Sequence, residues 1–409
     1  MRRLLSLRGT FRSLRKYNYR AYFVAAVLSN LGTWIQLVAE NWLILKLGGS
    51  GLALGITTGL QFLPVLVLSA YGGVVADRAD KRRLLTVLQS LMALPPLLLG
   101  ILIALGQVHI WLVWTAAFLV GIINAFSSPA IQAFAFELAG PDDVTNAVAL
   151  NSTVATLARA IGPAVGSLVA ATAGIAACFL LNAASYGIVV AALLLMRPSE
   201  LFAVKREQGP APTLKEGIQY AYGASGLAIV LVAFAVASVL GLNFQVLLPL
   251  VVTHVLSGNI QMYGLVMSDL GLGMTIGSLL VAAASTPTLS RVASLTLLFG
   301  LANALAGFAH NVVMVFATTF VLGIAATAFT TTCSVYLMKN AADTMRGRIM
   351  GFYILGLLGT APIGGPLIGW IAQATSPGVA FISAAIGCGI AGVFTLVMVS
   401  RSLSRTMSV

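Results

Sequence analysis

Long apolar stretches alternate with short polar segments along almost the whole chain. Twelve such stretches, each of about 15 to 26 residues, carry few or no charges. A bilayer core about 30 Å thick needs about 20 apolar residues per helix. The pattern therefore predicts an all-α polytopic membrane protein with twelve transmembrane helices. The predicted spans are 21–45, 52–76, 84–105, 111–136, 147–172, 175–196, 227–250, 263–284, 294–308, 312–337, 349–373 and 379–399.

The centre of the chain interrupts this pattern. Residues 197–225 begin with a polar stretch that contains Pro and Gly, and Thr213 and Glu216 then have the spacing of a capping box. We expect a cytoplasmic linker with a short interfacial helix there, between two six-helix bundles. The predicted organisation is a basic cytoplasmic tail (1–20), an N-terminal bundle (21–196), the linker (197–225), a C-terminal bundle (226–400) and a second cytoplasmic tail (401–409).

The two predicted bundles share a short repeat. Residues 29–36 (SNLGTWIQ) return in altered form 209 positions later as residues 238–245 (SVLGLNFQ), and at the same offset Gly55 falls on Gly264. Parallel six-helix repeats are a transporter architecture, with the substrate site near the midplane. The repeat therefore favours two pseudo-symmetric halves around a central path.

Basic residues indicate the orientation of these helices. Of 23 lysines and arginines, all but Lys46 and Arg159 fall in the two tails, the linker or the loops that share their side of the membrane. The positive-inside rule then places both termini in the cytoplasm. The net charge of +12 is explained by topology and by contact with anionic membrane lipids, so we do not expect a nucleic-acid partner.

The loop between the second and third predicted spans has the densest charge, with six charged residues among the seven from Asp77 to Arg83. It is either a solvated turn that sets topology or a site of its own. Its residues resemble the inner-loop signature of the major facilitator superfamily, although Asp80 replaces the usual Gly. That resemblance implies the fold of this superfamily and a cytoplasmic latch, with Glu137 as the partner of the basic cluster. The residues assigned to the latch are Gly73, Asp77, Arg78, Lys81, Arg82, Glu137, Arg346 and Arg348.

A second motif lies in the fifth predicted span. Gly162, Pro163 and Gly166 are similar to the Gly-Pro motif of drug–proton antiporters in this superfamily. Proline kinks a helix and glycine allows a neighbouring helix to approach closely. We assign these three residues to gating, although helix packing alone would also explain them.

The chain as a whole resembles the bacterial branch that includes enterobactin-type siderophore exporters and macrolide efflux carriers. The segments that carry this resemblance are residues 29–34, 61–64, 146–152 and 346–351. The resemblance implies export of a drug, a siderophore or another secondary metabolite. Ile131 stands where that family commonly has an arginine linked to proton transfer, so coupling has to be sought at other residues.

Three charged residues are predicted within the spans and away from the cytoplasmic segments: Glu40, Arg159 and Asp269. An ionisable group there costs about 2.5–3.5 kcal/mol on insertion scales and marks a functional site by default. We expect Glu40 or Asp269 to carry protons and Arg159 to face the cavity or a buried partner. The alternatives are structural: an interaction of Glu40 with Lys46, a bond of Asp269 to a neighbouring helix, and a structural tie through Arg159.

Polar and aromatic residues near these charges are candidates for the substrate cavity. Glu40 continues a polar stripe with helical spacing that would face the centre of the bundle. The aromatic candidates could line a site for a large amphipathic molecule, although core or lipid-facing positions would also accommodate them. The cavity candidates are Asn30, Thr33, Trp34, Gln36, Tyr186, Asn243, Phe244 and Gln245.

These features predict a secondary active transporter, in first place a proton-coupled exporter of a small amphipathic molecule working by alternating access. The alternative is a protein of the same fold that takes up metabolites or lipids, scrambles lipids or acts as a sensor. We expect no enzyme activity and no catalytic residues, because the sequence shows no His-Glu-x-x-His and no Gly-x-Ser-x-Gly motif. We also expect no cofactor and no metal, a monomer, and a location in the bacterial inner membrane, with a small-molecule substrate, protons and lipids as partners.

Overall fold

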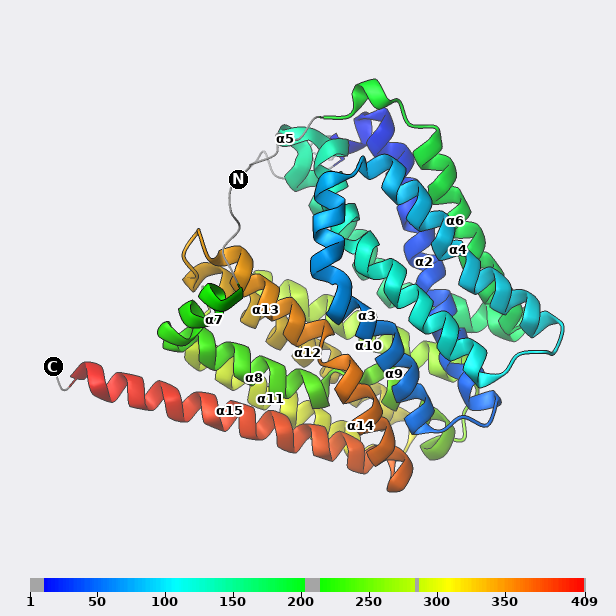
Figure 1. Ribbon diagram of the computed structural model, residues 1–409. Helices are drawn as coiled ribbons and strands as arrows, with labels where there is room; N and C mark the ends of the chain where they lie inside the picture. Colours follow the sequence, from blue (N-terminus) through cyan, green and yellow to red (C-terminus); the bar gives the residue numbers. More distant parts are fainter. Residues whose placement is uncertain (1–10, 203–213, 284–286, 408–409) are drawn as a thin grey trace. The chain divides into compact units, whose positions relative to one another are not determined.

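The computed structural model describes residues 11–202, 214–283 and 287–407 (Figure 1), and within them the chain is helical, without a strand. Thr213, the expected start of the linker helix, lies outside these residues. The elements are η1 (Arg12–Arg15), α2 (Tyr17–Lys46), α3 (Gly51–Arg78), α4 (Lys81–Ala104), α5 (Ile110–Thr172), α6 (Ile175–Leu194), η2 (Pro198–Glu200), α7 (Leu214–Gly223), α8 (Ser225–Gly241), α9 (Phe244–Leu250), η3 (Val251–Val255), α10 (Ile260–Ala282), α11 (Leu289–Gly307), α12 (Val312–Asn340), α13 (Arg346–Leu358), α14 (Ala361–Ala374) and α15 (Pro377–Met407).

Helix α5 contains two membrane crossings. Its 63 residues would extend about 95 Å at 1.5 Å per residue, about three times the thickness of a bilayer core. Gly140 breaks it with φ 70° and ψ 172°, values that suit glycine, and Pro141 follows as the first residue of the second segment. In the described part of the chain, 11 helices are long and apolar enough to span a membrane. Counting the two segments of α5 separately gives the twelve predicted crossings.

Two other crossings are interrupted. Residues 226–255 run from α8 through α9 into the π-helical turn η3, with a break at Leu242 and Asn243 that the apolar pattern did not predict. The Asn243 amide donates to the carbonyls of Val239 (2.7 Å) and Leu240 (3.2 Å), which satisfies the open end of α8. Residues 346–374 are likewise divided into α13 and α14 near Gly359.

The first of two compact units consists of Met1–Leu47 and Leu63–Gln208. Helix α2 packs against α5 and α6, and α4 packs against both of these. The core near the start of α2 includes Tyr19, Leu85 and Phe134, all fully buried. The hydroxyl of Tyr19 donates to the carbonyl of Ala147 over 3.1 Å, so this buried polar atom is satisfied.

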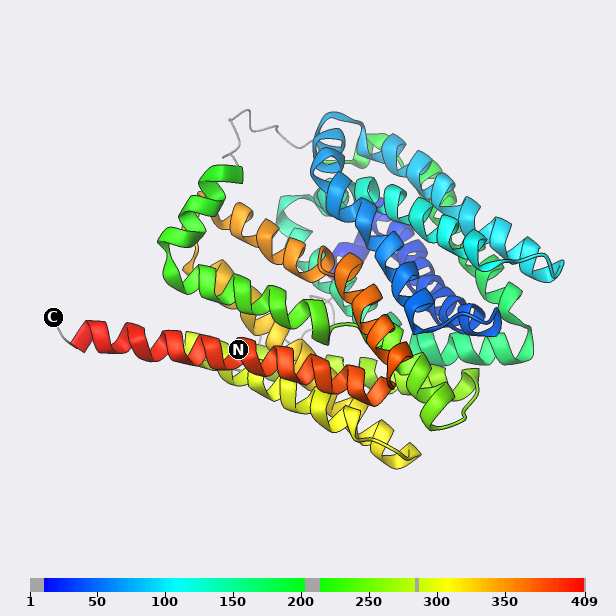
Figure 2. The same cartoon turned by 60° about the horizontal axis from the view of Figure 1, so that its bottom comes forward.

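The second unit consists of Gly48–Phe62 and Gly209–Val409. Helix α15 runs beside α11, as both views show (Figures 1 and 2), and α10 packs against α12. Stacked aromatic rings form its core: Tyr353 and Phe234 lie 4.6 Å apart, Phe234 and Phe329 5.6 Å, and Phe329 and Phe299 5.5 Å. These rings come from four different helices and hold α8, α11, α12 and α13 together.

Helix α3 contributes to both units, although its sequence belongs to the first six spans. Gly51 and Gly55 lie against the backbone of α14 at Gly369 and Gly365, so closely that a Cβ atom at Gly55 would collide with the carbonyl of Gly365. The amide N–H of Leu52 donates to the side chain of Gln373 over 3.3 Å. Small residues four positions apart allow helix backbones to meet in this way. The first part of α3 therefore packs with the second unit.

Candidate functional site

A chain of hydrogen bonds links α2 to α6 around Glu40. The amide of Gln36, one turn before Glu40, donates to the Glu40 carboxylate over 3.1 Å. The amide of Asn182 on α6 donates to the Gln36 carbonyl over 2.6 Å, and the hydroxyl of Ser185 lies 3.1 Å from the Asn182 carbonyl oxygen. Asn182 and Ser185 are buried, whereas Glu40 and Gln36 are partly exposed. The carboxylate is therefore joined to neutral amides at the edge of a packed interface.

Gly32 makes this approach of the two helices possible. A Cβ atom at this position would lie 2.7 Å from the Asn182 carbonyl oxygen and 2.9 Å from the Ser185 hydroxyl. Gly241 is its counterpart in the repeat, and it faces the Phe299 ring and Cys388 in the second unit in the same crowded manner. The repeated glycine thus marks an equivalent helix crossing in both halves of the sequence.

The other polar residues of the predicted stripe lie close to this chain. The hydroxyls of Thr33 and Tyr186 are 3.5 Å apart across α2 and α6, and Thr33 also donates to its own helix at Ser29. The Asn30 amide donates to the carbonyl of Ala26 over 2.8 Å, within α2. Thr33 is exposed and the Tyr186 side chain half-buried, so both can be reached from outside the unit.

Arg159 on α5 lies next to an aromatic residue of α2. Its guanidinium lies over the indole ring of Trp34, with 5.6 Å between the central carbon and the ring centroid. The glycines of the Gly162–Gly166 motif bring this helix close to α2: Gly162 contacts Trp34 and Gly166 contacts the backbone of Ile35. The motif therefore packs α5 on α2 and fixes the indole beside Arg159.

Asp269 lies in the second unit, where it accepts a hydrogen bond of 2.8 Å from the hydroxyl of buried Thr319 on α12. Gly273 on α10 lies against the backbone of Phe320, and Gly323 on α12 lies against that of Leu270. These contacts bring α10 and α12 together next to the carboxylate. Asp269 is thus a second partly exposed acid with a neutral partner.

The remaining cavity candidates of the second unit have different environments. Phe244 is 6% exposed and packs edge-on against Phe299, so its ring belongs to the core of this unit. Asn243 is buried and caps α8. Gln245 is half-buried in α9. Phe244 and Asn243 thus contribute to the packing of this unit, and of the three residues Gln245 alone is partly exposed.

The charged loop between α3 and α4 is tied to its surroundings in the first unit. The Lys81 ammonium lies 2.9 Å from the Glu137 carboxylate, with both side chains mostly buried. Arg82 donates to the carbonyls of Leu193 (2.7 Å) and Leu194 (2.9 Å), which places a cation at the end of α6. Asp77 and Arg78 are exposed.

Asp80, which departs from the family pattern, begins α4 as its N-cap. Its carboxylate accepts a hydrogen bond of 2.9 Å from the backbone N–H of Arg83. Aspartate is among the preferred residues at this position, so the turn has a local reason for the substitution.

Arg346 and Arg348 lie at the start of α13 in the second unit. Arg346 pairs with Asp343 over 2.5 Å and donates to the carbonyl of Met338 over 2.9 Å. The Arg348 side chain lies beside α7, with its Cβ atom close to Gly217. Arg346 therefore fastens the turn between α12 and α13, and Arg348 packs beside α7.

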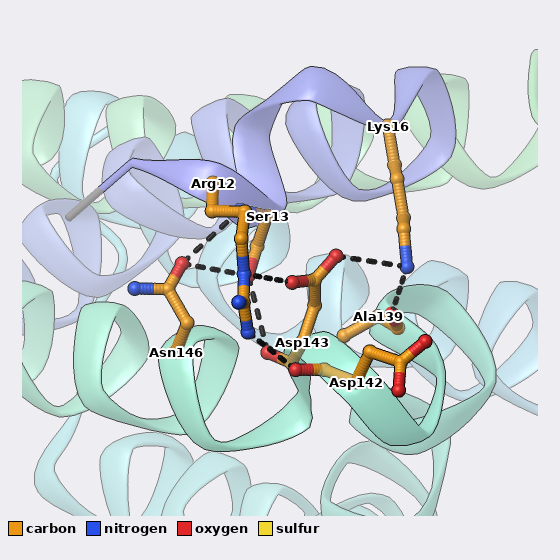
Figure 3. A network of polar contacts seen from close by, with 7 residues as sticks. All are labelled: Arg12, Ser13, Lys16, Ala139, Asp142, Asp143 and Asn146. Carbon is orange, nitrogen blue, oxygen red and sulfur yellow. Dashed lines mark hydrogen bonds and ion pairs between the residues drawn. The ribbon is translucent and has the colours of Figure 1, made fainter. Parts of the chain in front are cut away.

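One charged network was not anticipated from the sequence (Figure 3). Arg12, the first residue of η1, and Lys16, the N-cap of α2, both pair with Asp143, which follows the break in α5. Arg12 also donates to the backbone carbonyl of Asp142, and Lys16 to that of Ala139. Its other members are Ser13, whose hydroxyl lies 2.8 Å from the Asn146 side chain, and Asn146 itself.

This network lowers the pKa of the Asp143 carboxyl. Burial alone raises the pKa of the Asp143 carboxyl, but the hydrogen bonds and positive charges of Lys16 and Arg12 outweigh it, so the pKa is lower than the ordinary value. The partners are about 130 positions apart in the chain. The one signal in the sequence was the adjacent pair Asp142 and Asp143 after Gly140-Pro141, which the topology argument left unused.

Neither metal ligation nor cysteine chemistry is indicated in the described part of the chain. Its residues hold no group of three or more His, Cys, Asp or Glu side chains that could bind a metal ion. Cys178, Cys333 and Cys388 are buried and unpaired as thiols.

Comparison with known proteins gives a consistent result. Residues 8–407 match the profile of the family described as transmembrane secretion effector. The staphyloferrin A transporter of Staphylococcus aureus is 27% identical over 355 residues, which cover 85% of this chain and 87% of that protein. The multidrug efflux pump Tap of Mycolicibacterium fortuitum is 25% identical over 383 residues, which cover 90% of this chain and 92% of that protein.

Solved structures agree on the fold. A point mutant of the nucleoside transporter NupG superposes with a TM-score of 0.77 at 15% identity, covering 93% of this chain and 99% of that one. A transporter of the POT family superposes with a TM-score of 0.75 at 14% identity, covering 94% and 96%. At this level of identity the likeness concerns the fold alone.

Proposed function

Because the chain belongs to the transmembrane secretion effector family of major facilitator transporters, we propose that it is a proton-coupled exporter of a small amphipathic molecule. The two similar proteins with efflux or siderophore transport in their names support a drug or a siderophore as cargo. A facilitator fold with two six-helix halves supports alternating access as the mechanism.

The observation that supports proton coupling is the series of hydrogen bonds from Glu40 through Gln36 to Asn182. A carboxyl group bound to an amide can take up or release a proton without breaking an ion pair. The amides of Gln36 and Asn182 can also re-form their hydrogen bonds with the neutral acid, since Gln and Asn offer both donors and acceptors. Proton entry at Glu40 would weaken its charge-assisted bond and with it the tie between α2 and α6.

Asp269 is the second candidate for the proton, because it too is bound to a neutral partner, Thr319. Arg159 would act on the substrate side, where its guanidinium over Trp34 provides a cation and an aromatic surface together. Lining by Asn30, Thr33, Trp34, Gln36 and Tyr186 would suit a molecule with both polar and apolar parts.

We place both termini in the cytoplasm and the protein in the inner membrane of a bacterium, on the distribution of basic residues. The charged loop with Lys81, Arg82 and Glu137 would then lie on the cytoplasmic side. There it would act as a latch, because it ties the ends of α4, α5 and α6 to one another. Gly162, Pro163 and Gly166 would let α5 shift against α2 as the cavity opens.

Transport assays with Glu40→Gln test this function. Inverted vesicles are prepared with an interior more acidic than the outside medium. Uptake of ethidium, of a radiolabelled macrolide and of staphyloferrin A is then measured. Wild-type protein should accumulate at least one of them and lose accumulation when the gradient is collapsed. Glu40→Gln should lower the gradient-driven rate at least 10-fold, since the amide cannot carry a proton.

Two matched variants sharpen the result. Asp80→Asn should keep normal rates, because asparagine also caps a helix, and Asp269→Asn shows whether the second acid is needed. Gradient-independent flux in the wild type, or wild-type coupling in both Glu40→Gln and Asp269→Asn, would contradict the proposal.

A further inference from the structure

A pocket of about 740 Å³ opens in the first unit beside the charged network of Figure 3. Three segments form its walls: residues 15–18 at the start of α2, Leu138 just before the break in α5, and residues 197–202 after α6. Its volume is in the range of sites for small molecules. It lies where α2 begins and α6 ends, and so at one end of two membrane spans.

Long-range hydrogen bonds hold the walls in place. The Asn18 side chain accepts from the backbone N–H of Arg197 over 2.9 Å and donates to the carbonyl of the same residue over 2.8 Å. The N–H of Phe202 donates to the carbonyl of Glu137 over 2.9 Å, and the Phe202 ring closes over Gly140. The pocket is therefore built by contacts between segments that are far apart in the sequence.

The lining carries an excess of positive charge, although Lys16 also pairs with Asp143, outside the lining, over 3.1 Å. It contains Arg15, Lys16 and Arg197 against one acid, Glu200, which pairs with Arg197 over 2.9 Å. Lys16 lies 4.4 Å from the centre of the Phe202 ring, and Arg197 lies 4.5 Å from that of Tyr17. Arginine and lysine in this setting favour a phosphate group.

The surroundings of the pocket favour a phosphate that carries acyl chains. Leu194 and Leu195, just before Arg197, are 60% and 68% exposed at the end of a membrane-spanning helix. An amphiphile with its headgroup among the cations could lay its chains along these leucines. Basic pockets at the ends of transmembrane helices have the chemistry that binds anionic headgroups.

We propose that this pocket binds the phosphodiester headgroup of an anionic phospholipid. Arg15 and Arg197 contact the phosphate, Lys16 adds charge from its place between Asp143 and Phe202, and the acyl chains lie on Leu194 and Leu195. Lipid bound in this way joins the start of α2 to the segment after α6. The site is separate from the Glu40 chain and does not depend on the proposed transport activity.

Retention of lipid by the purified full-length protein tests this site. The protein is equilibrated in micelles that contain equal amounts of phosphatidylglycerol and phosphatidylcholine, and bound lipid is measured by native mass spectrometry. Wild-type protein should retain phosphatidylglycerol in preference. Arg15→Gln and Arg197→Gln should each lower its apparent affinity about five-fold, and the double variant about 25-fold, at about 1 kcal/mol per cation. The backbone bonds of Asn18 remain in all three variants.

Arg83→Gln is the matched control, because Arg83 is an exposed arginine at a helix start that is absent from the pocket lining. It should retain phosphatidylglycerol like the wild type. Inorganic phosphate added as a competitor distinguishes the source of the phosphate group. Equal retention of the two lipids, unchanged retention in the double variant, or displacement of the lipid by millimolar phosphate would overturn the proposal.

Discussion

Asp143 shows how much a single residue contributes to holding the start of the chain. Its carboxylate is shared by Arg12 and Lys16, which both lie in the short segment that leads into α2. Neutralising the Asp143 carboxylate would leave Arg12 and Lys16 with backbone carbonyls as their partners in this network. Docking of the η1 segment on the break in α5 therefore depends on this charge.

This charge gives the docking a defined pH dependence. The pKa of Asp143 is lower in the folded protein than in an unfolded chain, so its stabilising contribution is present above the unfolded value of about 3.9 and is lost as pH falls through the folded value. The protection of residues 12–20 against hydrogen exchange in the full-length protein, measured relative to the intrinsic rate at each pH, should fall only below about pH 4.

The Asp143→Asn variant should show fast exchange of residues 12–20 already at pH 7, with a local loss of about 1 kcal/mol. Asp142→Asn is its control, because Asp142 accepts from Arg12 through the backbone carbonyl and its own carboxylate is exposed. Equal exchange in both variants at pH 7 would show that the carboxylate of Asp143 does not hold the segment.

Pairs of residues differ in how far the sequence reveals them. The link between Glu137 and the basic loop could be expected, because the ends of neighbouring spans lie on one membrane face and opposite charges attract. The bond of Lys16 to Asp143 could not, since the basic tail was fully explained by topology. Likewise the polar spacing of Gln36 and Glu40 is visible within α2, but their partner Asn182 is identified only by the packing of α6.

At the level of elements, the break in α5 depends on one residue. Gly140 has a φ of 70° that L-residues rarely adopt, and a Cβ atom there would lie 2.9 Å from the Phe202 ring. Gly140→Ala should therefore lower stability by about 1–3 kcal/mol, measured as a lower midpoint of thermal unfolding in detergent.

Gly187→Ala in α6 is the comparison for this change, because open space surrounds that helical glycine. It should leave the midpoint unchanged or raise it, since alanine favours helix by up to about 1 kcal/mol. An unchanged midpoint for Gly140→Ala would mean that the break tolerates a side chain.

Helix boundaries followed from hydropathy where loops are charged and not where the backbone breaks inside an apolar run. The turn between the two segments of α5 was expected, because a polar stretch separates the predicted spans 111–136 and 147–172. The break at Leu242 and Asn243 was hidden, because its flanking residues are apolar and Asn243 satisfies the open carbonyls itself. The interruption near Gly359 was likewise not predicted, because apolar residues flank it on both sides.

At the level of the whole molecule, the proposed latch makes a prediction about transport. Lys81→Glu would face Glu137, and Glu137→Lys would face Lys81, so each single variant should lower the transport rate through repulsion at a mostly buried pair. The double variant, with both substitutions, should transport faster than the sum of the two single losses predicts. The difference should correspond to a coupling energy of about 0.5–3 kcal/mol. Initial rates in vesicles, normalised to the amount of inserted protein, measure this. Purely additive losses would show that the pair does not work as a unit.

The fold of the whole molecule was predictable, because membrane spans follow from the need to bury backbone polar groups within helices. It was not predictable that the first part of α3 packs with the second unit. Its contact with α14 is made by glycines whose partners are over 300 positions away in the sequence.

Helix α3 passes from one unit to the other between Phe62 and Leu63, and Pro64 follows at once. Proline removes the hydrogen bond to the carbonyl four residues earlier, at Leu60. Any rearrangement of the two units must either pull the glycines of α3 off α14 or bend α3 where it changes units. Bending is the less costly of the two, because Pro64 already removes one backbone hydrogen bond of α3 at this point.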